Sequence, residues 1–262
     1  MTIYGQNGKP MQLVAALHTT PIADVKPKEV HLCGDANDAI PVAEFIVGEM
    51  KKNPFTAEGK KIAQANRYDP AAENAAWNAL PWYAKWGGPP DFYGAAAGHK
   101  AAAYEMWAER VAPNRPWDHK PILRHKLEAS GKFNVGWQKY GQNDYFYDIW
   151  SNIHYGYVGI AIGFSASELI GGAGLAQALS DSINDVRHAR WPTMQNHPQN
   201  GSWPSSADDI PDHISIQLGI DLYATVKPGA LTADLLLRKI AAVPLPWGQG
   251  RDHAKRPHQC PR

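Results

Sequence analysis

Apolar residues recur at helical spacing in several parts of the chain, and each such run predicts one helix. The clearest run begins after Asp38, places Val42, Ile46 and Met50 on one face, and stops at Asn53-Pro54. Further helices are predicted over 71–80, 95–111, 122–128, 144–159 and 233–242. Two more are predicted, one that begins at Ser165 or Ser167 and one that runs from Asp208 or Asp209 through Leu222. Strand patterns are weak throughout. We therefore expect a mostly α fold, a single compact helical domain with long Trp-, Pro- and Gly-rich loops and few or no strands.

Turn-forming residues divide the chain into three parts. Residues 1–35 carry several Gly and Pro and one short apolar run, so they are expected to be an N-terminal extension. Residues 36–243 hold the predicted helices and form the expected functional domain. Residues 244–262 are rich in Pro and Arg and are expected to be a flexible C-terminal tail.

Charge and sequence pattern argue against three features: a long nucleic-acid surface, a membrane span and a secretory signal. Lys and Arg number 26 against 25 Asp and Glu, which gives a net charge of +1 at pH 7. A protein that binds long nucleic acid usually has a clear basic excess, so no long nucleic-acid surface is expected. No apolar run approaches the ~18 residues of a membrane span, and no stable span is expected. The N-terminus lacks the features of a secretory signal, so secretion would need a dedicated machine.

Cysteine and aromatic content add two open alternatives. The two cysteines, Cys33 and Cys260, allow at most one disulfide, and whether they pair is left open. The chain has ten Trp and eleven Tyr. These amphipathic rings either fill a Trp-rich core or contact sugar-like or lipid-headgroup-like ligands.

The segment 143–159 (NDYFYDIWSNIHYGYVG) carries the strongest functional signal in the sequence. A structural surface helix usually shows Lys, Glu or Arg opposite its apolar face, and this segment has almost no such charge. At 100° per residue, Tyr147, Ser151 and His154 share one stripe with Tyr157 beside it. Its polar groups are therefore expected to face a ligand cavity rather than bulk water.

An adjacent stripe of the same segment contains Asp148, Asn152 and Tyr155. If both stripes line one cavity, His154 is the candidate general acid or base, and Asp148 would orient an imidazole or bind a cation. The remaining residues of the two stripes are candidates for substrate binding. The structural alternative is a histidine that packs among aromatic rings and bonds to a backbone carbonyl.

Trp117-Asp118-His119-Lys120 is a second candidate cluster. Lys120 could bind an anion and His119 could be a second acid or base, with Trp117 and Asp118 near the substrate. Successive residues cannot all point the same way, so at most two of the charged three share a pocket. The structural alternative, which we weight equally, is a turn in which Asp118 caps the next helix.

A third cluster, Asp208, Asp209, Asp212 and His213, is interpreted as structural, because helix capping and the helix dipole explain its acids. No HExxH motif or clustered Cys/His spacing occurs, so no metal ligand is assigned. The expected cofactor is none, or one divalent cation held by Asp148 and another carboxylate. Gly171-Gly172-Ala173-Gly174 is interpreted as a close-packed helix junction rather than a phosphate loop.

Several of these motifs together resemble a known family. They are WDHKP at 117–121, YDIWSNIHYGYVG at 147–159, IQLGIDL at 216–222 and AEFIVGEM at 43–50. The chain resembles the polymorphic toxin type 44 family (bacterial toxin 44) over roughly residues 38 to 242. The third motif adds Gln217 to the candidate substrate-binding residues.

The resemblance implies an antibacterial toxin domain over 36–243 that a cognate immunity protein neutralises. Such domains are carried by large secreted proteins or by type VI secretion with a carrier or adaptor. The short N-terminus favours a stand-alone effector, secreted without a signal peptide and delivered into a target bacterium. Delivery to the periplasm is favoured over the cytoplasm.

Tyr147-Asp148, followed after five residues by His154, also resembles the core of colicin M-type toxins, which cleave the pyrophosphate linkage of lipid II. Those toxins carry an Asp two positions before the Tyr, where this chain has Tyr145. They carry an Arg after the His, where this chain has Tyr155. These departures put a shared mechanism in doubt.

Three functional hypotheses follow. The first is a hydrolase that attacks a phosphate-containing, lipid-linked cell-wall precursor, with Lys120 on the phosphate. The second is a metal-independent ribonuclease that acts in the target cytoplasm with His119 and His154 as its acid–base pair. The third is a toxin without enzymatic activity that binds a target or forms a pore.

Overall fold

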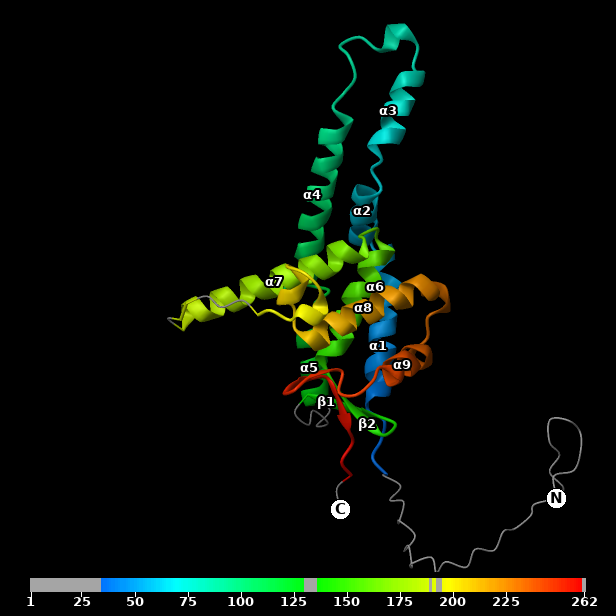
Figure 1. Ribbon diagram of the computed structural model, residues 1–262. Coiled ribbons are helices and arrows are strands. Elements are labelled where there is room, and N and C mark those ends of the chain that lie inside the picture. The colour runs from blue at the N-terminus through cyan, green and yellow to red at the C-terminus, as the bar shows by residue number, and fades with distance from the viewer. Residues whose placement is uncertain (1–33, 130–135, 189, 192–194, 261–262) are drawn as a thin grey trace, which may run out of the picture. The chain divides into compact units, whose positions relative to one another are not determined.

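The computed structural model describes residues 34–129, 136–188, 190–191 and 195–260, and Asp35–Arg262 form one compact unit. The expected N-terminal extension therefore lies almost wholly outside the described residues, as does Cys33. Within them the fold is mostly α, as predicted (Figure 1). The α-helices are α1 (Ala39–Lys52), α2 (Ala57–Asn66), α3 (Pro70–Ala79), α4 (Phe92–Val111), α5 (His119–Ala129), α6 (Asp148–Ala161), α7 (Ala166–Arg187), α8 (Ile210–Thr225) and α9 (Ala233–Ala242). Among the described residues no helix is both long and apolar enough to cross a bilayer.

Helices α6 and α8 form the closest helix pair of the core. A Cβ atom placed on Gly156 of α6 would lie 2.2 Å from the carbonyl oxygen of Ile216. A Cβ atom on Gly219 of α8 would lie 2.1 Å from the carbonyl oxygen of Ile153. Glycine at both positions is therefore what allows the two backbones to touch.

Helix α6 is buried because other helices surround it. It packs on α1, α5, α7 and α8, and α1 also packs on α9. Trp150, Ile153 and Tyr157 are fully buried on α6, and Ile46 and Met50 are fully buried on α1. The near absence of charge on α6 thus reflects burial on most of its circumference.

Helices α4 and α7 are joined through the first turn of α7. The backbone N–H of Glu168 donates to Oγ of Ser165, and the N–H of Ser165 donates to Oε2 of Glu168, which is a reciprocal capping box. Glu168 also pairs with Lys100 of α4 at 2.7 Å and accepts from the Tyr104 hydroxyl at 2.6 Å. The glycine run, expected to be a close-packed helix junction, lies within α7, and Gly174 packs closely on the segment before Ser205–Ala207, where a Cβ would lie 2.0 Å from the Pro204 carbonyl oxygen.

A small antiparallel sheet covers one end of the helices. Strand β2 (Asn143–Phe146) pairs with β1 (Trp137–Tyr140) on one side and with β5 (Lys255–Pro257) on the other. Strands β3 (Gly248–Gln249) and β4 (Asp252–His253) form a second antiparallel pair. Residues 244–260 were expected to be a flexible tail, and this is corrected: they form strands, and Trp247 is 1% exposed.

Buried polar contacts explain why this segment is ordered. Lys255 is buried on the inner face of the sheet and donates to the carbonyl oxygens of Ala241 and Val243, at 2.8 and 2.6 Å. The indole Nε1 of Trp247 donates to the Pro211 carbonyl oxygen at 3.3 Å. The C-terminal segment therefore attaches to both α8 and the end of α9.

Other boundaries differ from the predictions in instructive ways. Residues 144–146, expected to be helical, are in strand β2, and α6 begins at Asp148. Helix α2, not predicted, is capped by Thr56, whose Oγ1 accepts from the Gly59 N–H at 3.1 Å. Helix α7 is longer than the short helix expected. Helix α9 is capped by Thr232 as predicted.

Candidate functional site

A cavity of about 310 Å³ opens where the first turns of α6 and α8 meet β1, β2 and β4. Four carboxylates line it: Asp148, Asp209, Asp212 and Asp252. Trp137 and Phe146 form an aromatic part of its wall, and their rings contact each other with centroids 5.3 Å apart. Asp148 and Asp212 lie in the first turns of their helices, where the helix dipole favours a negative charge.

Lys120 connects two of these carboxylates. Its Nζ lies 3.4 Å from Oδ2 of Asp148 and 3.6 Å from Oδ2 of Asp212. Burial alone would lower the pKa of Lys120, but the charges of Asp212 and Asp148 outweigh it and raise the pKa above its ordinary value. Lys120 is therefore a permanent cation between two carboxylates, and all three side chains remain partly accessible to solvent.

The acidic groups of the site hold protons with different affinities. Burial raises the pKa of Asp212, with Lys120 opposing the shift and Asp148 adding to it. Burial also raises the pKa values of Asp209 and Asp252. Next to them, Asp208 is buried, its Oδ2 has no hydrogen-bond partner among the described residues, and burial raises its pKa to about 8. Carboxyl groups with raised proton affinity beside an ion-paired one can work as acid and base.

The two candidate histidines lie deeper than the cavity. His119 and His154 are each 0% exposed, and their rings meet edge to face with centroids 4.3 Å apart. Nε2 of His154 is hydrogen-bonded to Nδ2 of Asn53 at 2.9 Å, so its partner comes from the end of α1 and not from Asp148. Burial lowers the pKa values of both histidines, and each is neutral at physiological pH.

The predicted substrate-binding residues are spread over several environments. Asn152 and Tyr147 are half-buried on or beside the first turns of α6, near Asp148. Ser151 is buried, and its Oγ accepts from the His119 N–H at 3.3 Å. Asp118 accepts from the backbone N–H groups of Lys120 and Asn114, so it serves the turn before α5.

The remaining four candidates have structural partners. Trp117 is buried against Trp107. The Tyr155 hydroxyl donates to the Leu169 carbonyl oxygen, and the Tyr157 hydroxyl donates to the Val226 carbonyl oxygen. Gln217 donates to Asp221 on the same helix at 2.7 Å.

Lys120, Asp148 and Asp212 all lie in a segment that matches a known protein family. Residues 106–225 match the family model of bacterial toxin 44. This stretch is similar to that toxin family. The resemblance seen in the motifs is thus confirmed over 106–225, while the early motif at 43–50 lies outside the matched range. Comparisons with curated proteins and with solved structures give no match.

Sequence reasoning missed part of the candidate site. Asp209 and Asp212 were attributed to capping and the helix dipole, but Asp209 makes no side-chain capping bond at the start of α8. Asp252 was placed in the expected tail. One signal in the sequence could have indicated Asp209 and Asp212. A helix needs one capping acid, and the sequence offers three within five residues, Asp208, Asp209 and Asp212.

No group of three or more His, Cys, Asp or Glu among the described residues has the arrangement of a metal site. Lys120 supplies a positive charge next to Asp148 and Asp212, the charge that a metal ion would supply in a metal site. A divalent cation held by Asp148 and a second carboxylate stays a prediction that added metal can test.

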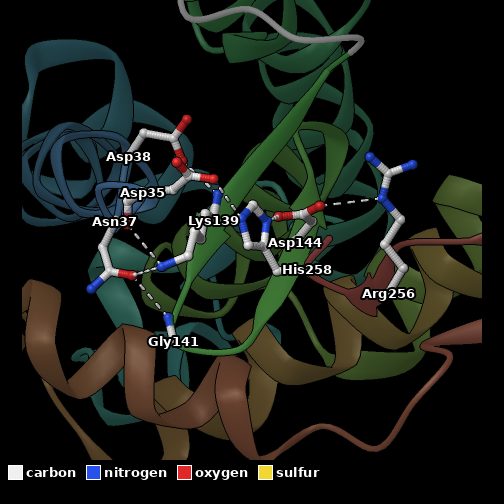
Figure 2. Close-up of polar contacts among 8 residues, drawn as sticks. All are labelled: Asp35, Asn37, Asp38, Lys139, Gly141, Asp144, Arg256 and His258. Atoms are coloured by element: carbon white, nitrogen blue, oxygen red, sulfur yellow. Dashed lines mark hydrogen bonds and ion pairs between the residues drawn. The ribbon is translucent and has the colours of Figure 1, made fainter. Parts of the chain in front are cut away.

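The outer face of the sheet carries a network of charged side chains beside the candidate site (Figure 2). Nδ1 of His258 lies 2.6 Å from Oδ1 of Asp144, and its Nε2 lies 3.0 Å from Oδ2 of Asp35. Arg256 donates from Nε to Oδ2 of Asp144 at 3.4 Å. The network joins the start of the folded unit, β2 and the C-terminal segment. It surrounds a second cavity of about 280 Å³ that shares Trp137 with the first.

The His258 contacts predict a pH-dependent contribution to stability. Burial would lower the pKa of His258, but hydrogen bonds to Asp144 and Asp35 outweigh it and raise the pKa. A raised histidine pKa stabilises the fold fully below the unfolded value of about 6.5 and loses this contribution as pH rises through the folded value. His258→Gln should therefore lower the melting temperature at pH 5.5 and have little effect at pH 9.

The control for this comparison is His125→Gln, because His125 is exposed on α5. Its melting temperature should follow that of the wild type at both pH values. A His258→Gln deficit of the same size at pH 5.5 and pH 9 would show that the charge of His258 does not stabilise the fold.

Proposed function

We propose that this protein is an antibacterial effector toxin that hydrolyses a phosphate-containing, lipid-linked cell-wall precursor in the envelope of a target bacterium. The observation that carries the proposal is the position of Lys120 between Asp148 and Asp212, two carboxylates that line an accessible cavity. The match to a bacterial toxin family supports the toxin part of the proposal.

Each of the three residues has a defined role in the proposed reaction. Asp148 accepts a proton from water as the water oxygen attacks phosphorus. The bond from phosphorus to the leaving oxygen breaks, and Asp212, whose pKa is raised by burial, donates a proton to that oxygen. Lys120 moves from its carboxylate partners to a phosphoryl oxygen and stabilises the charge that develops there.

The cavity also suits the rest of such a substrate. Trp137 and Phe146 offer flat apolar surfaces against which a sugar ring or a prenyl chain can pack. Because the lining is acidic, an anionic substrate should bind together with protons taken up by the carboxyl groups of raised pKa, Asp209, Asp212 and Asp252. Binding should therefore strengthen as pH falls.

This proposal changes the role expected for the histidines. His119 and His154 fill the space between α1, α5 and α6 and are closed to solvent. They support the positions of Lys120 and Asp148 at the starts of α5 and α6. The ribonuclease alternative would need both imidazoles at an RNA phosphate, and the conformation described here gives them no access to one.

The proposal extends to the toxin's biological setting. A cognate immunity protein would protect the producing cell, and a carrier or adaptor of a secretion machine would deliver the toxin without a signal peptide. The periplasm is the proposed site of action, since lipid-linked precursors are exposed there.

The direct test is incubation of the full chain with purified lipid II, with and without added Mg²⁺. We expect release of a prenol or of a pyrophosphate-linked sugar. No product under either condition would overturn the proposed substrate. Expression in the periplasm and in the cytoplasm of a sensitive bacterium separates the alternatives, because lysis only from the periplasm supports the envelope enzyme and RNA loss only from the cytoplasm supports a ribonuclease.

A further inference from the structure

The loop between α3 and α4, together with the first turn of α4, exposes several aromatic side chains. Trp82, Tyr83, Trp86 and Tyr93 are 80%, 66%, 85% and 70% exposed, and we call these four residues the aromatic tip. Core tryptophans such as Trp150 are fully buried, whereas Trp191 and Trp203 are also exposed, at 91% and 60%. Large apolar surfaces in water are unfavourable, and a contiguous exposed group of them marks an interaction site.

The aromatic tip lies at the end of a helical hairpin. Helices α3 and α4 run side by side, and the loop that joins them forms the end of the hairpin (Figure 1). None of the ten residues of α3, all of them described, is buried. The tip can therefore contact a large partner without the rest of the folded unit in the way.

The tip offers little charge to a partner. Between Leu80 and Tyr93 the sequence has one Lys and one Asp. Oδ1 of Asp91 caps α4 by accepting from the Gly94 N–H at 2.8 Å, and Nζ of Lys85 donates to the Asn78 carbonyl oxygen at 2.7 Å. Both charges are thus used within the hairpin, which argues against an electrostatic partner.

The backbone of the loop is suited to an apolar environment. Three of its residues, Pro81, Pro89 and Pro90, have no N–H group to satisfy. The N–H of Ala84 donates to the Pro81 carbonyl oxygen, and the N–H of Lys85 donates to the Trp82 carbonyl oxygen. The prolines and these bonds lower the cost of removing part of this loop from water.

We propose that the aromatic tip inserts into the lipid–water interface of a phospholipid bilayer and anchors the protein there. Trp and Tyr combine an apolar ring with a polar N–H or O–H group, and both concentrate at membrane interfaces for that reason. Because Lys85 and Asp91 already have partners within the hairpin, the tip fits uncharged lipid headgroups. The anchor does not depend on the proposed reaction.

Flotation of the full chain with phosphatidylcholine vesicles, which contain no cell-wall precursor, tests this inference. The wild type should float with the vesicles in both 0.1 M and 1 M NaCl, because apolar insertion resists salt. Its tryptophan emission should shift to shorter wavelength on binding. Trp82→Ser with Trp86→Ser should reduce the bound fraction about ten-fold, and both positions are exposed enough for the fold to tolerate the change.

Matched variants distinguish anchoring by the hairpin from adhesion through any exposed tryptophan. Trp191→Ser removes an equally exposed tryptophan outside the hairpin and should bind vesicles like the wild type. Asp212→Asn should also bind normally, so a failed catalytic proposal leaves this result unchanged. A wild type that does not float, or a double variant that floats equally well, would overturn the anchor, as would binding only to anionic vesicles that 1 M NaCl abolishes.

Discussion

Replacing Asp212 by Asn should lower killing of a sensitive bacterium by about 100-fold, the lower end of what a general acid contributes. The substitution keeps the size of the side chain but removes the proton that the proposal transfers to the leaving oxygen. It also removes one of the two carboxylates that hold Lys120. The readout is survival of target cells after periplasmic expression of the variant, with circular dichroism confirming that the variant is folded.

The matched control lies on the same helix. Asp221→Asn changes an exposed acid of α8 whose carboxylate accepts from Gln217 on the same helix, and it should remain fully toxic. Asp148→Asn should be as weak as Asp212→Asn, and the double variant should be little weaker, because groups that act in one step are not additive. Folded variants that kill like the wild type would point to a toxin without enzymatic activity.

Gly219→Ala should lower the free energy of unfolding by about 3 kcal/mol, because overpacking a rigid contact is among the costly changes in a protein core. The new Cβ would lie 2.1 Å from the Ile153 carbonyl oxygen and 2.8 Å from the Tyr157 backbone nitrogen. Both are backbone atoms of α6, so no side chain can turn away to make room. Urea denaturation followed by circular dichroism measures the loss.

Gly48→Ala is the matched control, because no atom lies within 4 Å of a Cβ placed at this position of α1. Alanine is a better helix former than glycine, so this variant should be more stable by about 0.5–1 kcal/mol. If Gly219→Ala were as stable as the wild type, α6 and α8 would not be in the close contact described here.

Local sequence patterns predicted most helices, because apolar spacing and capping residues act within one turn. The run from Val42 to Met50 is an example. The strand at 143–146 pairs with β1 across a short turn, which is a local contact, and with β5, more than 100 residues further along the chain, which no local pattern can indicate. The same long-range contact explains why the C-terminal segment was expected to be loose.

The candidate site was predicted in part. Lys120 and Asp148 were proposed from the sequence and form an ion pair, and Asp148 lines the cavity. His154 was proposed because α6 lacks charge, but burial among neighbouring helices produces the same pattern as a ligand cavity. Asp212 was assigned to the helix dipole, and only the position of Lys120 shows that it faces a partner from another helix.

The pairing of β5 with β2 limits how far the protein can be shortened for expression. The range recognised as bacterial toxin 44 ends at residue 225, yet Arg251, Asp252 and His253 of the cavity wall come after it. The amide that bonds to His154 comes before it, from Asn53. A recombinant fragment cut at the recognised limits would therefore lack one wall of its own cavity and part of its core, so expression should span residues 35–260.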